Sequence, residues 1–244
     1  SIKKIEHFET KQIMAVDAWA WTYYNKMMLN SGPYKIYGHE FQPEILSSTY
    51  RRQCAKKSPQ MMGLTEMMVI LSLHVLRYGR YPQGVLYMFP TDDEVSDFSK
   101  SRFKPFLMAN PKSIGRFVKA TDTTAVKKVG NAFLFFRGGR LKDIQGAQMS
   151  SSKLKALPVD CLIGDEIDEM DAGALTLALG RMDHSNVQEE FYLANPTVPN
   201  YGIDAKYQQS DQRVWMIECA SCGRENCLEL EFPSCLQRQK DGSV

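Results

Sequence analysis

The segment from Val159 to Asp168 is a short, mostly apolar run that ends in two adjacent carboxylates, Asp165 and Glu166. A strand buried in a parallel sheet reads as such a continuous apolar run. Buried carboxylates are costly unless they serve a metal ion or a charged partner. The pattern therefore predicts a strand whose carboxyl end binds hydrated Mg²⁺ and activates water, as a nucleotide hydrolase requires. An edge strand that runs into a polar turn would give the same pattern.

The chain has 244 residues, which is enough for one large α/β domain or for a domain with an appendage. Its hydrophobic content of 43% and charged content of 24% are those of an ordinary soluble globular protein. A net charge of +2 creates no global field that demands nucleic acid. No apolar run is long enough to span a membrane, and the N-terminus lacks a signal-peptide core. The missing initiator Met and the abrupt polar end predict a fragment of a longer protein.

Predicted strands alternate with helical stretches along most of the chain, which favours an α/β fold with a mainly parallel sheet and helices on both faces. The helical stretch at 63–77 carries apolar residues on one face, and Thr91 with Glu94 forms a capping box for another helix. The remaining helices are expected at 6–29 and 44–50. The strands are expected at 51–56, 84–90, 131–136, 159–164, 191–194 and 213–218.

A polar loop that begins at Lys57 follows the first predicted strand and leads into a helix. Strand, tight loop and helix form the layout of a phosphate-binding loop. In the pattern G-x-x-x-x-G-K-[ST], Gly63 and Thr65 match, while Ser58 replaces the first glycine and Leu64 replaces the lysine. The flexible side chain of Lys57 is long enough to reach back over the phosphates, and Thr65 is placed to bind Mg²⁺. An ordinary turn between strand and helix is the alternative.

The loop and the acid pair both follow predicted strands, at the edge of an open α/β sheet where ligands bind. A third polar strand end has the same position, because the strand at 191–194 runs into Asn195 and Thr197. Either side chain could face the terminal phosphate and report its loss. A turn started by Asn195 and Pro196 is the alternative.

Three blocks of the sequence resemble the ATPase domain of the large terminase subunit of lambda-like tailed phages, over roughly residues 40–223. The first block is the loop 57–66, in which lysine stands early and Gly-x-Thr-Glu closes the motif. The second block comprises Gly146-Ala147, Leu154, Leu157-Pro158-Val159 and Asp165-Glu166-Ile167-Asp168. The third comprises Asn195-Pro196-Thr197, Gly202-Ile203, Tyr207, Ser210-Asp211-Gln212-Arg213 and Cys219-x-x-Cys222-Gly223. Pro59 in the loop and Ala220-Ser221 between the cysteines depart from the family pattern.

The resemblance implies a P-loop NTPase fold of the RecA/ASCE-like class that uses ATP and Mg²⁺. Lys57, with Ser58 and Gly63 of the loop, would bind the phosphates. Thr65 and Asp165 would hold Mg²⁺, the latter largely through water.

The resemblance also implies roles outside the loop. Glu166 would activate the attacking water, and Asn195 and Thr197 would form a coupling motif. Gln42 resembles the glutamine that recognises adenine, with a solvated helix-start residue as the alternative. Arg140 is the favoured candidate for an arginine that acts on a neighbouring subunit, ahead of Arg102 or a surface role.

Cys219 and Cys222 are a plausible half of a zinc site, which Cys227 and Cys235 could complete, although two free thiols in a turn would look the same. The six cysteines form no small disulfide scaffold, which favours a reducing compartment. We expect a helical lead-in at 1–40, the ATPase core at 41–212 and a Cys-rich appendage at 213–244. The appendage would be truncated before a nuclease domain, and no carboxylate cluster supports nuclease activity here.

The family resemblance further implies a DNA-packaging motor in the cytoplasm of the host cell. Its partners would be double-stranded DNA bound without sequence preference, the portal protein, the small terminase subunit and other copies in a ring. Lys127-Lys128 and Lys153-Lys155 are candidate DNA contacts, with solvated surface lysines as the alternative. A helicase-type ATPase remains an alternative, as does a degenerate P-loop scaffold that does not hydrolyse nucleotide, since Leu64 stands at the usual lysine position.

Overall fold

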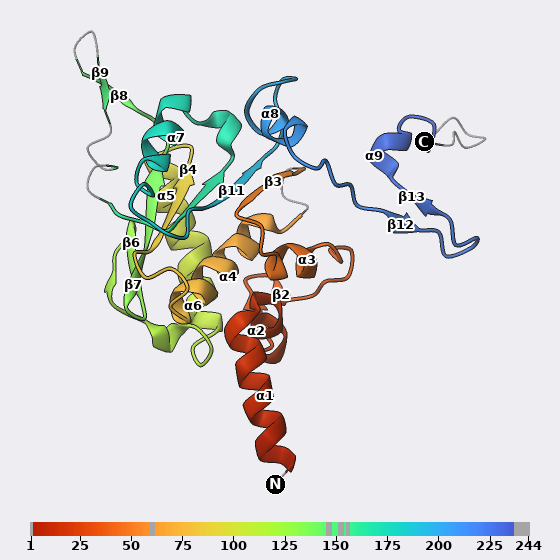
Figure 1. Cartoon of the computed structure of the whole chain (residues 1–244), viewed down its shortest axis with the longest axis horizontal. Coiled ribbons are helices and arrows are strands. Elements are labelled where there is room, and N and C mark those ends of the chain that lie inside the picture. The colour runs from red at the N-terminus through yellow and green to blue at the C-terminus, as the bar shows by residue number, and fades with distance from the viewer. Residues whose placement is uncertain (1, 59–61, 145–147, 151–153, 155–156, 237–244) are drawn as a thin grey trace. The chain divides into compact units, whose positions relative to one another are not determined.

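The computed structural model describes residues 2–58, 62–144, 148–150, 154 and 157–236. Four sets of residues singled out from the sequence therefore lie outside the described residues: Pro59, Gly146-Ala147, Lys153 and Lys155. The chain divides into two compact units, Ser1–Gln208 and Gln209–Val244 (Figure 1).

A seven-stranded sheet forms the centre of the first unit (Figure 1). In spatial order its strands are β3 (Arg52–Lys56), β11 (Glu189–Ala194), β10 (Cys161–Asp165), β4 (Val85–Phe89), β7 (Ala132–Gly138), β6 (Val126–Val129) and β5 (Val118–Asp122). The first five strands are parallel, and β6 and β5 extend the sheet as antiparallel strands. These parallel pairings confirm the predicted mainly parallel sheet. The later strand β11 lies between β3 and β10. The antiparallel pair was not predicted.

The two central strands are buried along their full length, which explains their continuous apolar runs. Every residue of β4 and β10 is buried. Side chains alternate between the two faces, so Val85, Tyr87 and Phe89 enter one core while Leu86 and Met88 enter another. Helices pack on both faces, with α4 (Leu64–Arg77) in the first core and α7 (Ala172–Leu179) in the second.

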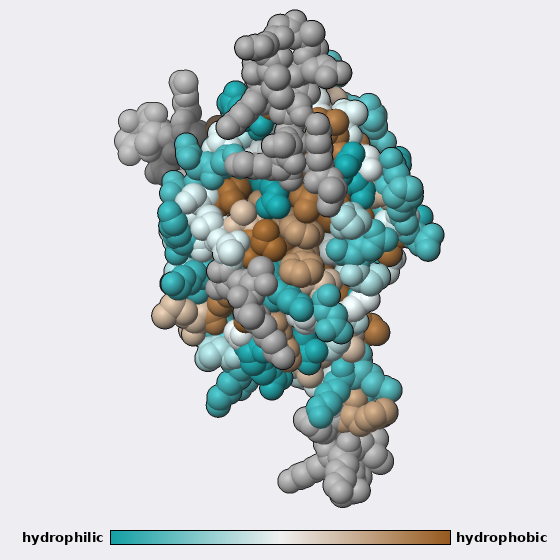
Figure 2. All heavy atoms as spheres, turned by 90° about the vertical axis from the view of Figure 1, so that its left-hand side faces the viewer, coloured by the Kyte–Doolittle hydropathy of each residue, from teal (hydrophilic) through white to brown (hydrophobic). Residues whose placement is uncertain are grey.

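Apart from the 15-residue helix α1, the remaining elements of the first unit are short. The α-helices are α1 (Ile2–Val16), α2 (Ala18–Tyr24), α3 (Gln42–Ser47), α5 (Asp92–Phe98), α6 (Lys104–Ala109) and α8 (Gly202–Gln208). A π-helix, η1 (Ser99–Phe103), joins α5 to α6, and η2 (Gly115–Phe117) and η4 (Ile167–Glu169) are 3₁₀ turns. The hairpins are β1 (Met28–Leu29) with β2 (Gly32–Pro33), and β8 (Lys142–Ile144) with β9 (Gln148–Ser150). Figure 2 shows apolar residues at the centre of one face, among hydrophilic ones.

The single helix predicted at 6–29 is wrong, because the chain breaks into α1 and α2 at Asp17. The Asp17 side chain accepts a hydrogen bond from the Ala20 N–H at 2.5 Å and caps α2. The break changes which face is buried: Trp21 packs in the core, whereas Ile13 and Val16 are exposed. Within the lead-in segment, α2 is thus packed into the core of the first unit.

The sixth predicted strand, 213–218, is also wrong as a member of the central sheet. Only β12 (Ile217–Glu218) forms there, and it pairs with β13 (Glu225–Asn226) inside the second unit. That unit also contains α9 (Leu228–Glu231). Among the described helices, none is long and apolar enough to cross a membrane.

Candidate functional site

The register of the parallel strands brings the three polar strand ends to one edge of the sheet. Ala194 pairs with Lys56 on one side, and Leu193 pairs with Asp165 on the other. The Lys57 N–H then donates to the Ala194 carbonyl at 2.9 Å, which continues the ladder one residue further. The loop, the acid pair and the Asn195 strand end are therefore neighbours, as the sequence predicted.

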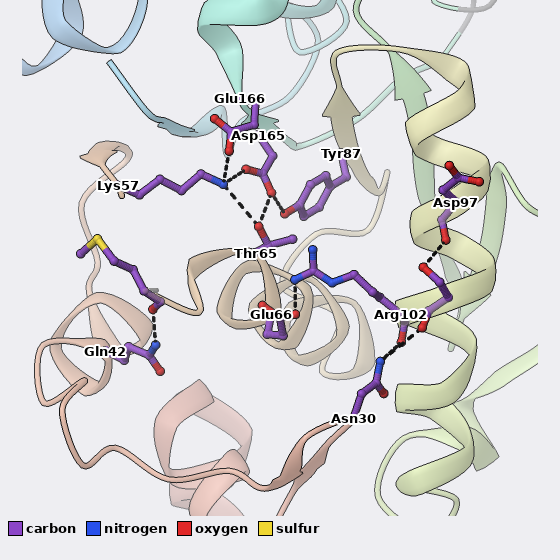
Figure 3. Close-up of polar contacts among 12 residues, drawn as sticks. Asn30, Gln42, Lys57, Thr65, Glu66, Tyr87, Asp97, Arg102, Asp165 and Glu166 are labelled. Carbon is purple, nitrogen blue, oxygen red and sulfur yellow. Dashed lines mark hydrogen bonds and ion pairs between the residues drawn. The ribbon is translucent and has the colours of Figure 1, made fainter. Parts of the chain in front are cut away.

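The Lys57 side chain forms the centre of a polar cluster (Figure 3). Its Nζ lies 2.5 Å from Asp165 Oδ1 and 3.0 Å from Glu166 Oε1. It also donates to Thr65 Oγ1 at 3.5 Å. Burial alone would lower the pKa of Lys57, but the two carboxylates outweigh burial and raise it. The ammonium is therefore held charged between the two acids.

Asp165 is almost fully buried and accepts three hydrogen bonds. Besides Lys57, the Thr65 hydroxyl donates to Oδ2 at 2.7 Å and the Tyr87 phenol donates to the same oxygen at 2.9 Å. Burial raises the pKa of Tyr87 well above its usual value, and the Asp165 charge adds to this shift. The phenol thus stays protonated as a donor. These donors offset the cost of burying the carboxylate and fix its orientation.

Gly63 begins the helix that carries Thr65. Its φ of +61° lies in the left-handed region, which glycine adopts without strain, and α4 starts at the next residue. A Cβ at this position would lie 3.0 Å from Gln42 Nε2. The glycine therefore permits both the turn and the close approach of Gln42.

Gln42 is buried at the start of α3, so the alternative of a solvated helix-start residue is wrong. Its Nε2 donates to the Met62 carbonyl at 2.7 Å, and its Oε1 accepts a hydrogen bond from the Tyr34 hydroxyl. The nitrogen of the amide thus holds the end of the loop (Figure 3), and Tyr34 engages its oxygen.

The turn after β10 connects the acid pair to the Asn195 strand end. Glu166 has a φ of +59°, and its Oε2 accepts a hydrogen bond from the Asn195 N–H at 3.1 Å. Two residues later, Asp168 Oδ2 accepts from the Thr197 N–H at 3.0 Å and from the Thr197 hydroxyl at 2.9 Å. Asn195 and Thr197 therefore contact the acidic turn through hydrogen bonds that the sequence did not specify.

Two other predicted residues are exposed, Ser58 in the loop and Arg140 beyond β7. The Gly139 N–H donates to the carbonyls of Phe89 and Pro90, which places Arg140 near the carboxyl end of β4. In the described part of the chain, Arg140 is not a partner of the Lys57 cluster. Arg102, the other candidate, forms an ion pair with Glu66 on the first turn of α4.

The residues present fit Mg²⁺. The Thr65 hydroxyl and the Asp165 carboxylate are hard oxygen ligands on the same side of the cluster, 2.7 Å apart. Mg²⁺ in nucleotide sites takes one or two protein oxygens and completes its shell with water and phosphates. No larger set of acidic side chains is needed for that chemistry.

A family model for the ATPase domain of phage terminase large subunit gpA matches residues 32–240. The chain belongs to this family. The match covers both the Lys57 cluster and the cysteine pair. Among curated proteins, no sequence match was found.

Two solved structures resemble the fold of this terminase chain. The ATPase domain of the Thermus phage P74-26 large terminase aligns with a TM-score of 0.51 and 13% identity, over 76% of this chain and 75% of that one. The large terminase of bacteriophage HK97 aligns with a TM-score of 0.59 and 11% identity, over 81% of this chain and 42% of that one. The predicted P-loop fold of the ASCE class is therefore confirmed.

The second unit of the terminase chain holds the cysteine pair in the turn of the β12–β13 hairpin. The Gly223 N–H donates to the Cys219 carbonyl at 2.8 Å, and hydrogen bonds from the backbone of Ser221 and Cys222 lower the pKa of Cys219. Across the described residues, however, no group of three or more His, Cys, Asp or Glu is placed to hold a metal ion. The prediction of zinc is therefore not supported.

One predicted DNA contact of the terminase chain is wrong. Lys127 is only 3% exposed, and its Nζ lies 5.1 Å from the centre of the Phe103 ring. It packs inside the first unit because it alternates on β6 with the half-exposed Lys128. Lys128 alone of this pair remains a candidate.

Sequence reasoning missed roles for Tyr87 and Asp168. Tyr87 stands in the middle of an apolar strand, where its hydroxyl is the only sign that a polar partner is required. Asp168 was visible as part of the acidic segment, but its spacing from Thr197 and Ile203 gave no indication that they meet.

Proposed function

We propose that this chain hydrolyses ATP with the help of Mg²⁺ and uses the reaction to move double-stranded DNA into a procapsid. One observation carries the proposal: the Lys57 ammonium contacts Thr65, Asp165 and Glu166, which come from two other segments of the chain. A cation, a hydroxyl and two carboxylates at one sheet edge supply what phosphoryl transfer needs.

In the proposed reaction, Lys57 turns from the carboxylates to the β- and γ-phosphates, with the backbone of Ser58 and Gly63 lining the loop. Thr65 and Asp165 would hold Mg²⁺, which would supply charge stabilisation for the transferred phosphoryl group. Glu166, freed from Lys57, takes the proton from the attacking water. Asn195 and Thr197 couple the state of the nucleotide to the rest of the domain.

The proposal extends to an assembly. Several copies would ring the DNA with the portal protein and the small terminase subunit, in the cytoplasm of the infected host. Arg140, exposed beyond β7, would act on nucleotide bound by a neighbouring copy. DNA would be gripped through its phosphates, without sequence preference. No nuclease activity is proposed for these residues.

Family membership favours the packaging motor over a helicase-type ATPase. The scaffold alternative rested on Leu64 at the usual lysine position, and Lys57 supplies a cation from the other end of the loop. A site built in this way needs no lysine at position 64.

Calorimetric titration of the chain with a Mg–ATP analogue tests the proposal. We expect saturable binding that Lys57→Ala and Asp165→Ala each weaken tenfold or more, which corresponds to about 1.4 kcal/mol. Lys112→Ala and Asp183→Ala remove the same side chains from exposed positions and should leave affinity unchanged. Circular dichroism establishes that each variant is folded.

Undetectable binding by the parent chain would overturn an autonomous nucleotide site and favour the scaffold. Binding that survives both substitutions would place the nucleotide elsewhere. A slow turnover would not contradict the proposal, because a lone chain receives no arginine from a neighbour.

A further inference from the structure

Asp168 gathers three hydrogen bonds from a segment about 30 residues further along the chain. Oδ2 accepts from the N–H and the hydroxyl of Thr197 at 3.0 and 2.9 Å, and Oδ1 accepts from the Ile203 N–H at 2.7 Å. The carboxylate therefore ties the end of β11 to the start of α8. Bonds to a charged acceptor are stronger than neutral ones, so this is a firm attachment.

A glycine at position 202 permits the close approach of Asp168. Gly202, at the first position of α8, has a φ of +51°, where a side chain would be strained. A Cβ there would lie 2.1 Å from Asp168 Oδ1 and 2.4 Å from its Cγ. No substituent fits at Gly202 unless the contact with Asp168 is lost.

The attached segment is linked to the candidate nucleotide site at two further points. Glu166 accepts from the Asn195 N–H with one oxygen, while its other oxygen lies 3.0 Å from Lys57 Nζ. Asp204 of α8 forms an ion pair with Lys56, the residue directly before Lys57. Residues 195–208 are thus held by carboxylates and a lysine that are adjacent to the phosphate-binding groups.

We propose that Asp168 is a positioning residue that makes residues 195–208 move with the turn that carries Glu166. This inference rests on the proposed ATPase function and assigns the mechanical link of the same site. Because η4 is a tight 3₁₀ turn, Glu166 and Asp168 shift together when nucleotide draws Lys57 away from Glu166. Asp168 then carries that shift to Thr197 and α8, while Glu166 meets the water.

A purely stabilising contact would have the same geometry but would not respond to nucleotide. A coupling contact differs between the nucleotide-free and the nucleotide-bound state, whereas a purely stabilising contact is the same in both. The decisive quantity is therefore the change that nucleotide causes in residues 195–208, with and without Asp168.

Hydrogen exchange of the full chain, followed by mass spectrometry on peptides covering 195–208, measures this change. In the parent chain we expect a saturating Mg–ATP analogue to alter exchange in these peptides at least twofold. In Asp168→Ala, exchange without nucleotide should rise about tenfold and the response to nucleotide should vanish, while affinity stays within threefold of the parent. Glu169→Ala, at an exposed position of the same turn, should behave like the parent.

A pair of milder variants keeps the test decisive if Asp168→Ala fails to fold. Thr197→Val removes the hydroxyl donor and should weaken the nucleotide response. Thr197→Ser keeps the donor and should restore the response to the parent level.

Nucleotide binding without any exchange change in the parent would overturn the inference alone. Exchange of residues 195–208 that is unchanged in Asp168→Ala, or a response to nucleotide that stays intact there, would also overturn the inference. If Asp168→Ala is unfolded, the same outcomes in Thr197→Val would overturn it. No nucleotide binding by the parent would instead overturn the proposed function, and the coupling role with it.

Discussion

The Glu166 carboxylate accepts a hydrogen bond from the Asn195 N–H at 3.1 Å with one oxygen, and its other oxygen lies 3.0 Å from Lys57 Nζ. One acid thus touches both the phosphate-binding lysine and the strand end that leads to α8. The acid proposed to activate water therefore also contacts the proposed coupling segment directly. These two roles are separable by substitution.

Glu166→Gln should slow hydrolysis strongly while leaving nucleotide binding nearly intact. The amide keeps an oxygen that accepts from the Asn195 N–H, but it cannot take a proton from water. General-base catalysis contributes roughly 10²–10⁴-fold, so we expect kcat to fall by about that factor. The measurement is steady-state ATPase activity of the assembled motor, together with calorimetric affinity.

Glu169→Gln is the matched control, because it makes the same chemical change at an exposed position three residues away. Equal loss of activity in both variants would show that general disturbance of the turn, rather than proton transfer, causes the defect. A Glu166→Gln variant that turns over at the parent rate would remove Glu166 as the base.

Tyr87→Phe should raise the Mg²⁺ concentration needed for nucleotide binding. The phenol donates to Asp165 Oδ2 at 2.9 Å, and its loss frees a buried carboxylate to rotate away from the Thr65 side. A lost hydrogen bond to a charged group is worth about 1.5–3 kcal/mol, so we expect a shift of roughly tenfold to a hundredfold. Titration of Mg²⁺ at fixed analogue concentration gives the value.

Tyr81→Phe provides the control for that change. Tyr81 is also fully buried, and its hydroxyl donates to the Glu189 carboxylate. Tyr81 precedes β4 and therefore lies at the opposite end of that strand from the site. Both variants should lose stability in urea, but only Tyr87→Phe should alter the Mg²⁺ requirement. A Mg²⁺ shift in both would indicate a global effect.

The parallel core was predictable because local signals there agree with the tertiary structure. Continuous apolar runs at β4 and β10 can be satisfied only by burial on both faces. Polar residues directly after parallel strands meet at one edge of the sheet, whichever order the strands take. This argument placed Lys57, which follows β3, and Asp165, which ends β10, at the same edge without any knowledge of the strand order.

Pairing and long-range contacts were not predictable from local pattern. β5 is the edge strand and β6 lies next to it. Both contain lysine, and neither is a continuous apolar run from which its pairing could be predicted. The N-terminal helix break depends on one capping residue, Asp17, and leaves Ile13 and Val16 exposed instead of buried. Asp168 meets Thr197 only because β11 lies beside β10, and the local sequence does not encode that order.

The stability of the first unit should fall as the pH drops below about 6.5, because of His74. Burial lowers the pKa of His74, against the opposing effect of its hydrogen bond to the Met14 carbonyl. Below about pH 6.5, His74 therefore binds a proton more readily in the unfolded chain than in the folded chain. The free energy of unfolding then decreases by up to about 1.4 kcal/mol per pH unit, until the folded pKa is passed.

Urea unfolding between pH 7.5 and 5.0 measures this slope. His74→Gln keeps a donor for the Met14 carbonyl and removes the titrating imidazole. The change of its unfolding free energy with pH should therefore be smaller, by up to about 1.4 kcal/mol per pH unit, which corresponds to one proton. His184→Gln makes the same change at an exposed position and should retain the parent slope. Identical slopes in all three chains would show that other groups govern the acid response.

Gln42→Ala distinguishes adenine recognition from support of the loop. The Gln42 amide already donates to the Met62 carbonyl and accepts from Tyr34, so in this arrangement it holds the end of the loop. Support of the loop predicts that ATP and GTP analogues weaken together, by roughly tenfold for a lost buried hydrogen bond and its unsatisfied partner.

Adenine recognition predicts a different pattern, in which Gln42→Ala weakens the ATP analogue and leaves the GTP analogue unchanged. Tyr34→Phe separates the two roles further, because it removes one partner of the amide while the glutamine stays in place. If Gln42 supports the loop, Tyr34→Phe should weaken both nucleotides in the same direction as Gln42→Ala, but less. If Gln42 instead turns to read adenine, releasing it from Tyr34 should leave ATP affinity equal or higher. Calorimetry with both nucleotides on the three chains decides between the roles.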